Sequence, residues 1–154
     1  MANPLSPAGI SVPRSSYETV GEIVFFGRML DKIRLNASGK LGPGYYLGDD
    51  QDPTWFDGRC CRFLGVKYRD VVERALAGGT DDELLQWCFQ RGRKPSEEDI
   101  LIWNSFMSKR GWRDPASEEL CSEAKNLGVA NPQSIHTFFD LQDADEGRPP
   151  RYPK

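Results

Sequence analysis

The sequence predicts an all-α fold: a compact single domain of six or seven short helices around a central charged amphipathic helix. Three observations support this prediction. Residues that begin and end helices recur at short intervals along the second half of the chain. No stretch alternates polar and apolar residues for long enough to indicate a strand. The length of 154 residues is usual for one domain and is enough to bury a core without disulfide bonds.

The central helix is predicted from the run Gly-Arg-Met-Leu-Asp-Lys-Ile-Arg-Leu at residues 27–35. With a helical period, Phe26, Leu30, Ile33 and Ala37 form its apolar face. The charged side chains around the rest of the helix are Arg28, Asp31, Lys32 and Arg34. Leu35 falls in the middle of this charged arc, which a surface helix would keep polar. We therefore expect the second face to be covered as well, with its charges at least partly buried and paired.

The domain is expected to span residues 14–148, with residues 1–13 as a flexible N-terminal tail and residues 149–154 as a short C-terminal tail. The N-terminal tail is rich in proline and has no periodicity, so it cannot bury enough surface to offset the entropy lost on ordering. Ser15 and Glu18 have the spacing of a capping box, which predicts a first helix before the central one.

Residues 40–57 are dense in glycine, proline and aspartate, which predicts a long loop. The aromatic residues in and beside it are Tyr45, Tyr46, Trp55 and Phe56. A loop of this length inside a compact domain is typical of a functional segment or a lid. The alternative is that the aromatic side chains only pin an irregular loop to the core.

Further helices are predicted between the boundary residues Asp57 and Gly65, Tyr68 and Gly78, Thr80 and Gly92, Ser96 and Gly111, Asp114 and Gly128, and Gln133 and Ala144. In the helix that Ser96 opens, Trp103 and Asn104 share a face with Ile100 and Met107. Trp103 is expected in the core or the wall of a groove. Asn104 is expected to be largely buried, with its amide hydrogen-bonded.

Composition limits the partners and the compartment. Twenty basic and twenty-three acidic residues give a net charge of -3. A protein with this charge does not have the overall positive field that usually attracts nucleic acids and anionic membranes. We therefore expect no nucleic-acid partner and no membrane partner. Four cysteines without a repeated spacing indicate free thiols in a reducing compartment. With no signal-like N-terminus and no apolar run of roughly 20 residues, the predicted location is cytoplasmic.

Several separated motifs carry a family resemblance. They are the run at residues 28–34, Asp57-Gly-Arg with Phe63-Leu-Gly65, Thr80-Asp-Asp-Glu83 with Leu85 and Trp87, Glu98-Asp-Ile100 with Trp103-Asn104, and the ending from Phe138 to Arg148. In these motifs the chain resembles a mostly bacterial family, domain of unknown function 5069. The resemblance implies no activity, cofactor or catalytic residue. The family often has proline where Gly27 stands, so the resemblance does not fix the residue at which the central helix begins.

The charges of the central helix have two interpretations. They can form ion pairs with the C-terminal carboxylates of Asp140, Asp143, Asp145 and Glu146, which would anchor the end of the chain. Alternatively, Arg28, Lys32 and Arg34 stay partly unpaired around a pocket for an anionic group. The ligand-binding candidates are Arg28, Lys32, Arg34, Trp55, Trp103 and Asn104. An excess of cations in a cleft would favour the second interpretation.

His136 is the only histidine, and Asp140 follows it at the spacing of one helical turn, so the carboxylate could orient the ring for proton transfer. With one histidine and no Cys-x-x-Cys motif, no zinc site is predicted. Asp50 and its acidic neighbours lack the spacing of a calcium-binding loop, so no metal is expected. No cofactor is expected, because no glycine-rich phosphate loop or dinucleotide fingerprint occurs.

Two functional hypotheses follow. The leading one is a non-catalytic binding or interaction module that recognises a small anionic ligand or a partner protein. The alternative is a small enzyme that transfers protons through Asp31, Lys32 and His136 in a cleft under the loop of residues 40–57. The alternative requires these three side chains to converge on one cavity. The sequence does not specify the oligomeric state.

Overall fold

The computed structural model describes residues 11–48 and 50–152. In chain order, its elements are β1 (Thr19–Val20), β2 (Ile23–Val24), α1 (Phe26–Ala37), α2 (Phe56–Leu64), α3 (Tyr68–Leu76), α4 (Asp81–Arg91), α5 (Glu97–Lys109), α6 (Ser117–Asn126), the 3-10 turn η1 (Pro132–Ser134) and α7 (Phe138–Asp145). Seven α-helices with one very short antiparallel hairpin make up the described part of the chain, so the predicted fold class is confirmed.

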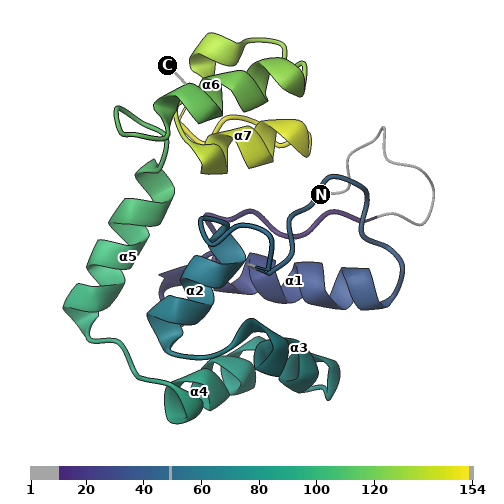
Figure 1. Ribbon diagram of the computed structural model, residues 1–154, viewed down its shortest axis with the longest axis vertical. Helices are drawn as coiled ribbons and strands as arrows, with labels where there is room; N and C mark the ends of the chain where they lie inside the picture. The colour runs from purple at the N-terminus through teal and green to yellow at the C-terminus, as the bar shows by residue number, and fades with distance from the viewer. Residues whose placement is uncertain (1–10, 49, 153–154) are drawn as a thin grey trace.

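Helix α1 lies across the middle of the molecule, with α2 beside it (Figure 1). Helices α3 and α4 form the lower layer, and α1 packs directly on α3. Helices α6 and α7 form a separate upper layer. Helix α5 runs along one side from α4 to α6 and contacts both β2 and α7. The two layers are therefore held together by α5 and by the side-chain contacts between α1 and the end of α7.

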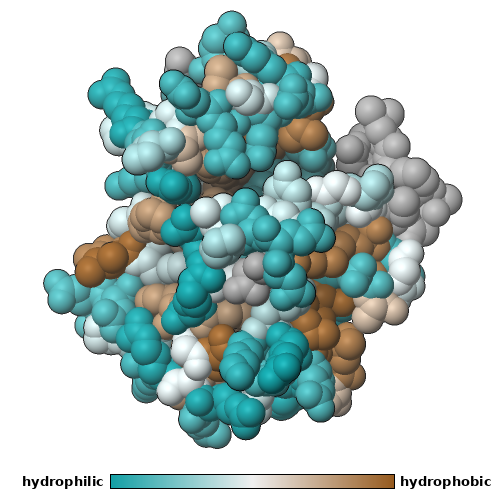
Figure 2. All heavy atoms as spheres, viewed as in Figure 1, coloured by the Kyte–Doolittle hydropathy of each residue, from teal (hydrophilic) through white to brown (hydrophobic). Residues whose placement is uncertain are grey.

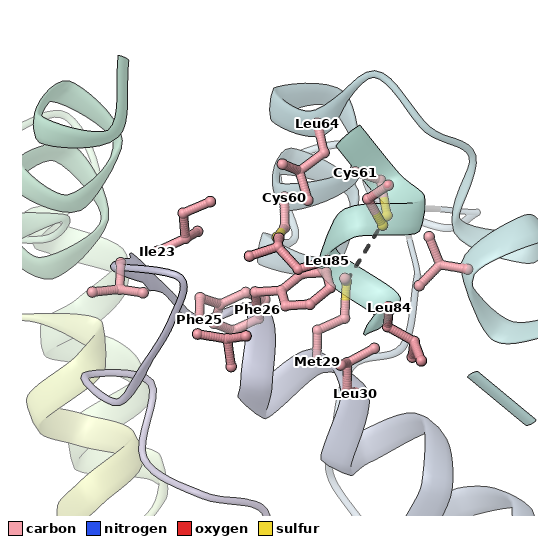
Figure 3. Close-up of a cluster of buried hydrophobic side chains, with 14 of the residues drawn as sticks. Ile23, Phe25, Phe26, Met29, Leu30, Cys60, Cys61, Leu64, Leu84 and Leu85 are labelled. Carbon is pink, nitrogen blue, oxygen red and sulfur yellow. Dashed lines mark hydrogen bonds between the residues drawn. The ribbon is translucent and has the colours of Figure 1, made fainter. Parts of the chain in front are cut away.

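The main hydrophobic core is built on the apolar face of α1. Phe26 and Leu30 are fully buried and Ile33 is nearly so, as the helical periodicity predicts. Ala37, which was predicted on the same face, is the last residue of α1 and is exposed. Figure 3 shows the side chains of α2 and α4 converging on this face, and those it labels are Cys60, Cys61, Leu64, Leu84 and Leu85. The sulfur of Cys61 lies 3.9 Å from the sulfur of Met29. Burial of this face supplies the main hydrophobic stabilisation of α1.

The segment before α1 is a β-hairpin, so the predicted first helix is wrong. One contact of a capping box forms, since the Ser15 N–H donates to the Glu18 carboxylate, but the Glu18 N–H donates to the backbone oxygen of Ser15 and closes a turn. Gly21 and Glu22 then adopt φ values of 53° and 68°, as the two central residues of a type I′ hairpin turn do. A capping box predicts a helix only where a helical apolar period follows it, and here the two-residue strands Thr19–Val20 and Ile23–Val24 stand on either side of a turn.

Trp103 and Asn104 attach this hairpin to α5. The Trp103 indole N–H donates to the backbone oxygen of Val24 at 3.1 Å, and the ring stacks on Phe63 at 4.6 Å. The Asn104 carbonyl accepts from the Val24 N–H at 3.1 Å, and its amide donates to the Glu22 backbone oxygen at 2.7 Å. The expected burial of Trp103 and the expected bonding of Asn104 are confirmed, although Asn104 is only half-buried.

The last two helices begin later than the sequence predicts. The Asp114 carboxylate accepts from the N–H groups of Gly111 and Ala116, so it stabilises a turn, and α6 follows that turn. The predicted last helix is split into η1 and α7. Helix α7 starts only after Thr137, whose hydroxyl accepts from the Asp140 N–H as an N-cap. Helix propensity continues across this break, but the local capping bonds determine where each helix starts.

The upper layer has a small core of its own, formed by Leu120, Ala124 and Leu141. Figure 2 shows hydrophilic side chains over most of one face and hydrophobic atoms at the edge that α5 forms. On α5, Leu101 and Ile102 are both more than half exposed. A core this small cannot fix the upper layer alone, so its connections to α1 determine where it sits.

We predict that Trp103→Ala lowers the free energy of unfolding by about 3–5 kcal/mol, because it removes a large buried aromatic side chain. Leu101→Ala on the same helix is the matched control. Leu101 is 66% exposed, so its loss should change stability by no more than about 0.5 kcal/mol. Denaturant midpoints measure both. A loss below about 1 kcal/mol for the tryptophan variant would show that the ring is not part of the core.

Candidate functional site

A cavity of about 490 Å³ lies between α1 and the upper layer of α6 and α7. Its floor is formed by α1 and the start of α2, one wall by the loop before α2, and the opposite walls by α6, α7 and the end of α5. The side chains of Arg28, Lys32 and Trp55 line it, and each was a ligand-binding candidate from the sequence. The other three candidates, Arg34, Trp103 and Asn104, do not line it.

Arg28 forms a closed ion pair at the floor of the cavity. Its two terminal nitrogens donate to the two oxygens of Glu146 at 2.7 and 2.9 Å, and both residues are almost fully buried. Tyr45 from the loop donates to the same carboxylate at 2.7 Å, and Arg148 donates to it as well. Burial and this hydrogen bond raise the pKa of Tyr45. One carboxylate thus connects α1, the loop and the end of α7.

Lys32 forms a second buried ion pair, with Asp57. Its ammonium nitrogen lies 2.7 Å from Asp57 Oδ1 and donates to the backbone oxygen of Tyr46 at 2.8 Å. The Gly48 N–H donates to Asp57 Oδ2 at 3.0 Å, so both side chains fasten the loop to the floor. Asp57 lies in the first turn of α2, one residue past its start, and is not the predicted N-cap. Burial lowers the pKa of Lys32, and the charge of Asp57 opposes this shift.

The contact between Lys32 and Asp57 is a buried ion pair. The ammonium nitrogen of Lys32 lies 2.7 Å from Oδ1 of Asp57. Asp57 is 1% exposed, so bulk water does not replace this contact. Removal of either charge would therefore leave the other one buried without compensation.

Asp31 and Arg34 belong to a different network, outside the cavity. Arg14 donates to the Asp31 carboxylate from its backbone N–H and from its guanidinium at 2.8–2.9 Å. Arg14 and Arg34 also both donate to Asp81 at 2.7 Å. Asp31 thus bonds to Arg14, which precedes β1, while Arg28 and Arg34 of its own helix bond to Glu146 and Asp81. Arg14 comes from a segment that was expected at the edge of the domain, so helical spacing could not point to it.

His136 is exposed and precedes α7, so it does not share a helix with Asp140 as the sequence predicted. It is not among the residues that line the cavity. Asp140 instead accepts from the hydroxyl of Tyr17 at 2.6 Å. Of the three proton-transfer candidates, Lys32 alone lines the cavity, and Asp31 and His136 do not join it there.

The rim carries an aromatic pair. The rings of Tyr46 and Trp55 are stacked at 4.6 Å and nearly parallel, at 7°. Tyr46 is 53% exposed, so the pair presents aromatic surface at the mouth. The loop therefore combines two properties that the sequence left as alternatives. Lys32 and Asp57 pin it to the core, and its aromatic side chains line a cavity.

The cavity also contains charges with no ion-pair partner among the described residues. On α6, Glu119 and Glu123 lie one turn apart, and burial together with Glu119 raises the pKa of Glu123. On α7, burial and Glu146 raise the pKa of Asp145. The uncompensated cation is Arg59 of α2. Burial and Arg110 lower its pKa, and Arg110 itself pairs with Asp114 at 3.3 Å.

Sequence reasoning did not select the residues that compensate the buried cations or the acids of α6. Glu146 was recognised as part of a C-terminal acidic group, but no pattern ranked it above Asp140 or Asp143. Asp57 was interpreted as a helix cap. Glu119 and Glu123 have the spacing of one helix face beside Leu120, a signal that could have identified an acidic face next to the core.

In the described part of the chain, no three or more His, Cys, Asp or Glu side chains are grouped so that they could hold a metal ion. Asp49, next to Asp50 in the acidic stretch of the loop, lies outside the described residues. Within the described ranges, no helix has the length and apolar character needed to cross a bilayer.

Fold and site together define a small helical domain that encloses a mixed polar and aromatic cavity between a central helix and a C-terminal helical layer. The model of the family described as Domain of unknown function (DUF5069) matches residues 10–148. The chain belongs to that family, and the predicted resemblance is confirmed. A search of curated proteins found no match.

We predict that Asp57→Asn lowers stability by roughly 3–5 kcal/mol, because the Lys32 ammonium would stay buried without its counter-charge. Asp31→Asn is the matched comparison on the other network, where the partners are partly exposed. Its loss should be only about 1–2 kcal/mol. Urea denaturation measures both variants. Equal losses would show that burial does not separate the two networks.

The cysteines give a chemical test of the core. Cys60, Cys61 and Cys88 are buried, and Cys121 is exposed; none is in a disulfide. The adjacent residues Cys60 and Cys61 are both almost fully shielded from solvent. Burial raises the pKa of Cys60 and raises that of Cys88 to about 12, so neither thiol is poised to react.

A thiol-specific disulfide reagent should therefore modify one thiol per native chain rapidly, and all four cysteines in denaturant. Cys121→Ser should remove the rapid phase and leave the slow ones unchanged. Two rapid thiols would contradict the buried placement. Fewer than four thiols in denaturant without reductant would reveal a disulfide.

Proposed function

We propose that this domain is a non-catalytic binding module that takes a small molecule in the cavity between α1 and the layer of α6 and α7. The observation that carries the proposal is a cavity of about 490 Å³ whose floor and rim are fixed by buried ion pairs. Sites for small molecules usually have volumes of about 300–1,000 Å³ and combine aromatic walls with a few fixed polar groups. The volume of this cavity lies in that range, and its lining places aromatic rings beside charged groups that include two buried ion pairs.

The fixed polar groups favour binding over support of the fold alone. If the ion pairs of Arg28 and Lys32 only supported the fold, the elements around them could pack closely and leave no open volume. Instead, an open volume remains beside them, with the aromatic rings of Tyr46 and Trp55 at its rim. Ligand binding in a preformed cavity of this kind loses little conformational entropy in the protein.

The enzymatic alternative now depends on Lys32. A buried amine with a lowered pKa beside a carboxylate can act as a base or a nucleophile. However, its ammonium group already has Asp57 and the Tyr46 oxygen as partners, and neither Asp31 nor His136 lines the same cavity. The geometry therefore supports binding better than proton transfer.

A thermal-shift screen of the whole chain against a library of anionic, neutral and cationic metabolites tests the proposal, because a ligand that binds only the folded state raises the Tm. Leu127→Trp should abolish the shift by filling the mouth, where Leu127 is 51% exposed. Leu76→Trp, at a leucine 52% exposed and outside the cavity, is the matched control and should keep it. Hits that survive Leu127→Trp, or a library without hits, would contradict the proposal.

A further inference from the structure

The charges that face the cavity are not balanced once the internal ion pairs are removed. Three lining cations have internal carboxylate partners and contribute no net charge: Arg28 pairs with Glu146, Lys32 with Asp57 and Arg110 with Asp114. The lining groups without an ion-pair partner in the described ranges are the carboxylates of Glu119, Glu123 and Asp145 and the guanidinium of Arg59. Three negative groups against one positive group leave the cavity with an excess of negative charge.

The two carboxylates of α6 lie close to the aromatic rim. The charges of Glu123 and then Glu119 contribute to the raised pKa of Tyr46, and Glu123 is the largest contributor. Glu119 also raises the pKa of Glu123, so the two carboxylates repel each other. Tyr46 in turn stacks on Trp55. Negative charge and aromatic surface thus meet at one place, next to the mouth.

We propose that the ligand of this cavity is an organic cation: a protonated amine on a planar or aromatic body. This inference rests on the proposed function and specifies its ligand class. A cation is attracted both by the negative faces of aromatic rings and by the carboxylates beside them. It also relieves the repulsion between Glu119 and Glu123. The planar body packs against the pair of Tyr46 and Trp55.

An anionic ligand, the class that the sequence suggested, is less favourable here. Its recognition would need cations free of internal partners, and Arg28 and Lys32 are both paired. Arg59 has no ion-pair partner in the described chain, but its guanidinium stacks over Phe106 at 5.3 Å. An anion that reached Arg59 would still share the cavity with three uncompensated carboxylates.

Tryptamine and indole-3-acetate are the probes, because they carry the same ring and opposite charges at neutral pH. Isothermal titration of the full chain should show tryptamine binding at least about tenfold more tightly, which corresponds to about 1.4 kcal/mol. The double variant Glu119→Gln, Glu123→Gln should weaken tryptamine at least about fivefold and leave indole-3-acetate equal or tighter. The control Glu118→Gln, Glu97→Gln makes the same change in net charge at exposed positions outside the cavity and should preserve the preference.

Each other outcome overturns the inference in a distinct way. Tighter binding of indole-3-acetate, abolished by Leu127→Trp, would show an anion site and keep the proposed binding function. Equal affinities would show that charge does not select the ligand. If neither probe binds, the cation class fails, and the metabolite screen decides separately whether the cavity binds anything. A loss of preference in the control variant would show only long-range attraction by net charge.

Discussion

The structure depends on the burial of two cations, Arg28 and Lys32, on a helix that already buries its opposite face. Removing a charged group from water costs several kcal/mol, so each cation requires a close carboxylate. Glu146 comes from the far end of the chain and Asp57 from the first turn of α2. Both the C-terminal layer and the loop before α2 must therefore return to α1, and their return encloses the cavity.

The same ion pairs decide what the cavity can recognise. Because the two conspicuous cations are compensated internally, the groups left to meet a ligand are an aromatic pair, the carboxylates of α6 and α7, and one guanidinium. A charged helix in the sequence thus gives a misleading impression of the site. Its cations organise the surrounding elements, and residues on other elements supply the free charge.

Much of the fold could be predicted because helical periodicity and helix-end residues are local signals. Even the covered charged face of α1 was predictable, since Leu35 interrupts an otherwise polar arc. The ion-pair partners of these charges could not be predicted, because contacts such as that between Arg14 and Asp31 join segments that only the whole fold brings together. The hairpin before α1 was missed for a different reason: its turn depends on positive φ at Gly21 and Glu22, which a capping-box pattern obscures. The acidic wall of the cavity could not be predicted, because the sequence does not show which part of the fold α6 faces.

A double-mutant cycle between Arg28→Met and Glu146→Gln tests the central claim most directly. If this pair fastens the C-terminal layer to α1, each single variant leaves a buried group uncompensated and loses roughly 3–5 kcal/mol. The double variant should then lose at least about 2 kcal/mol less than the sum of the two. Losses that add within about 0.5 kcal/mol would show that the two side chains are not energetically coupled and that another contact positions the layer.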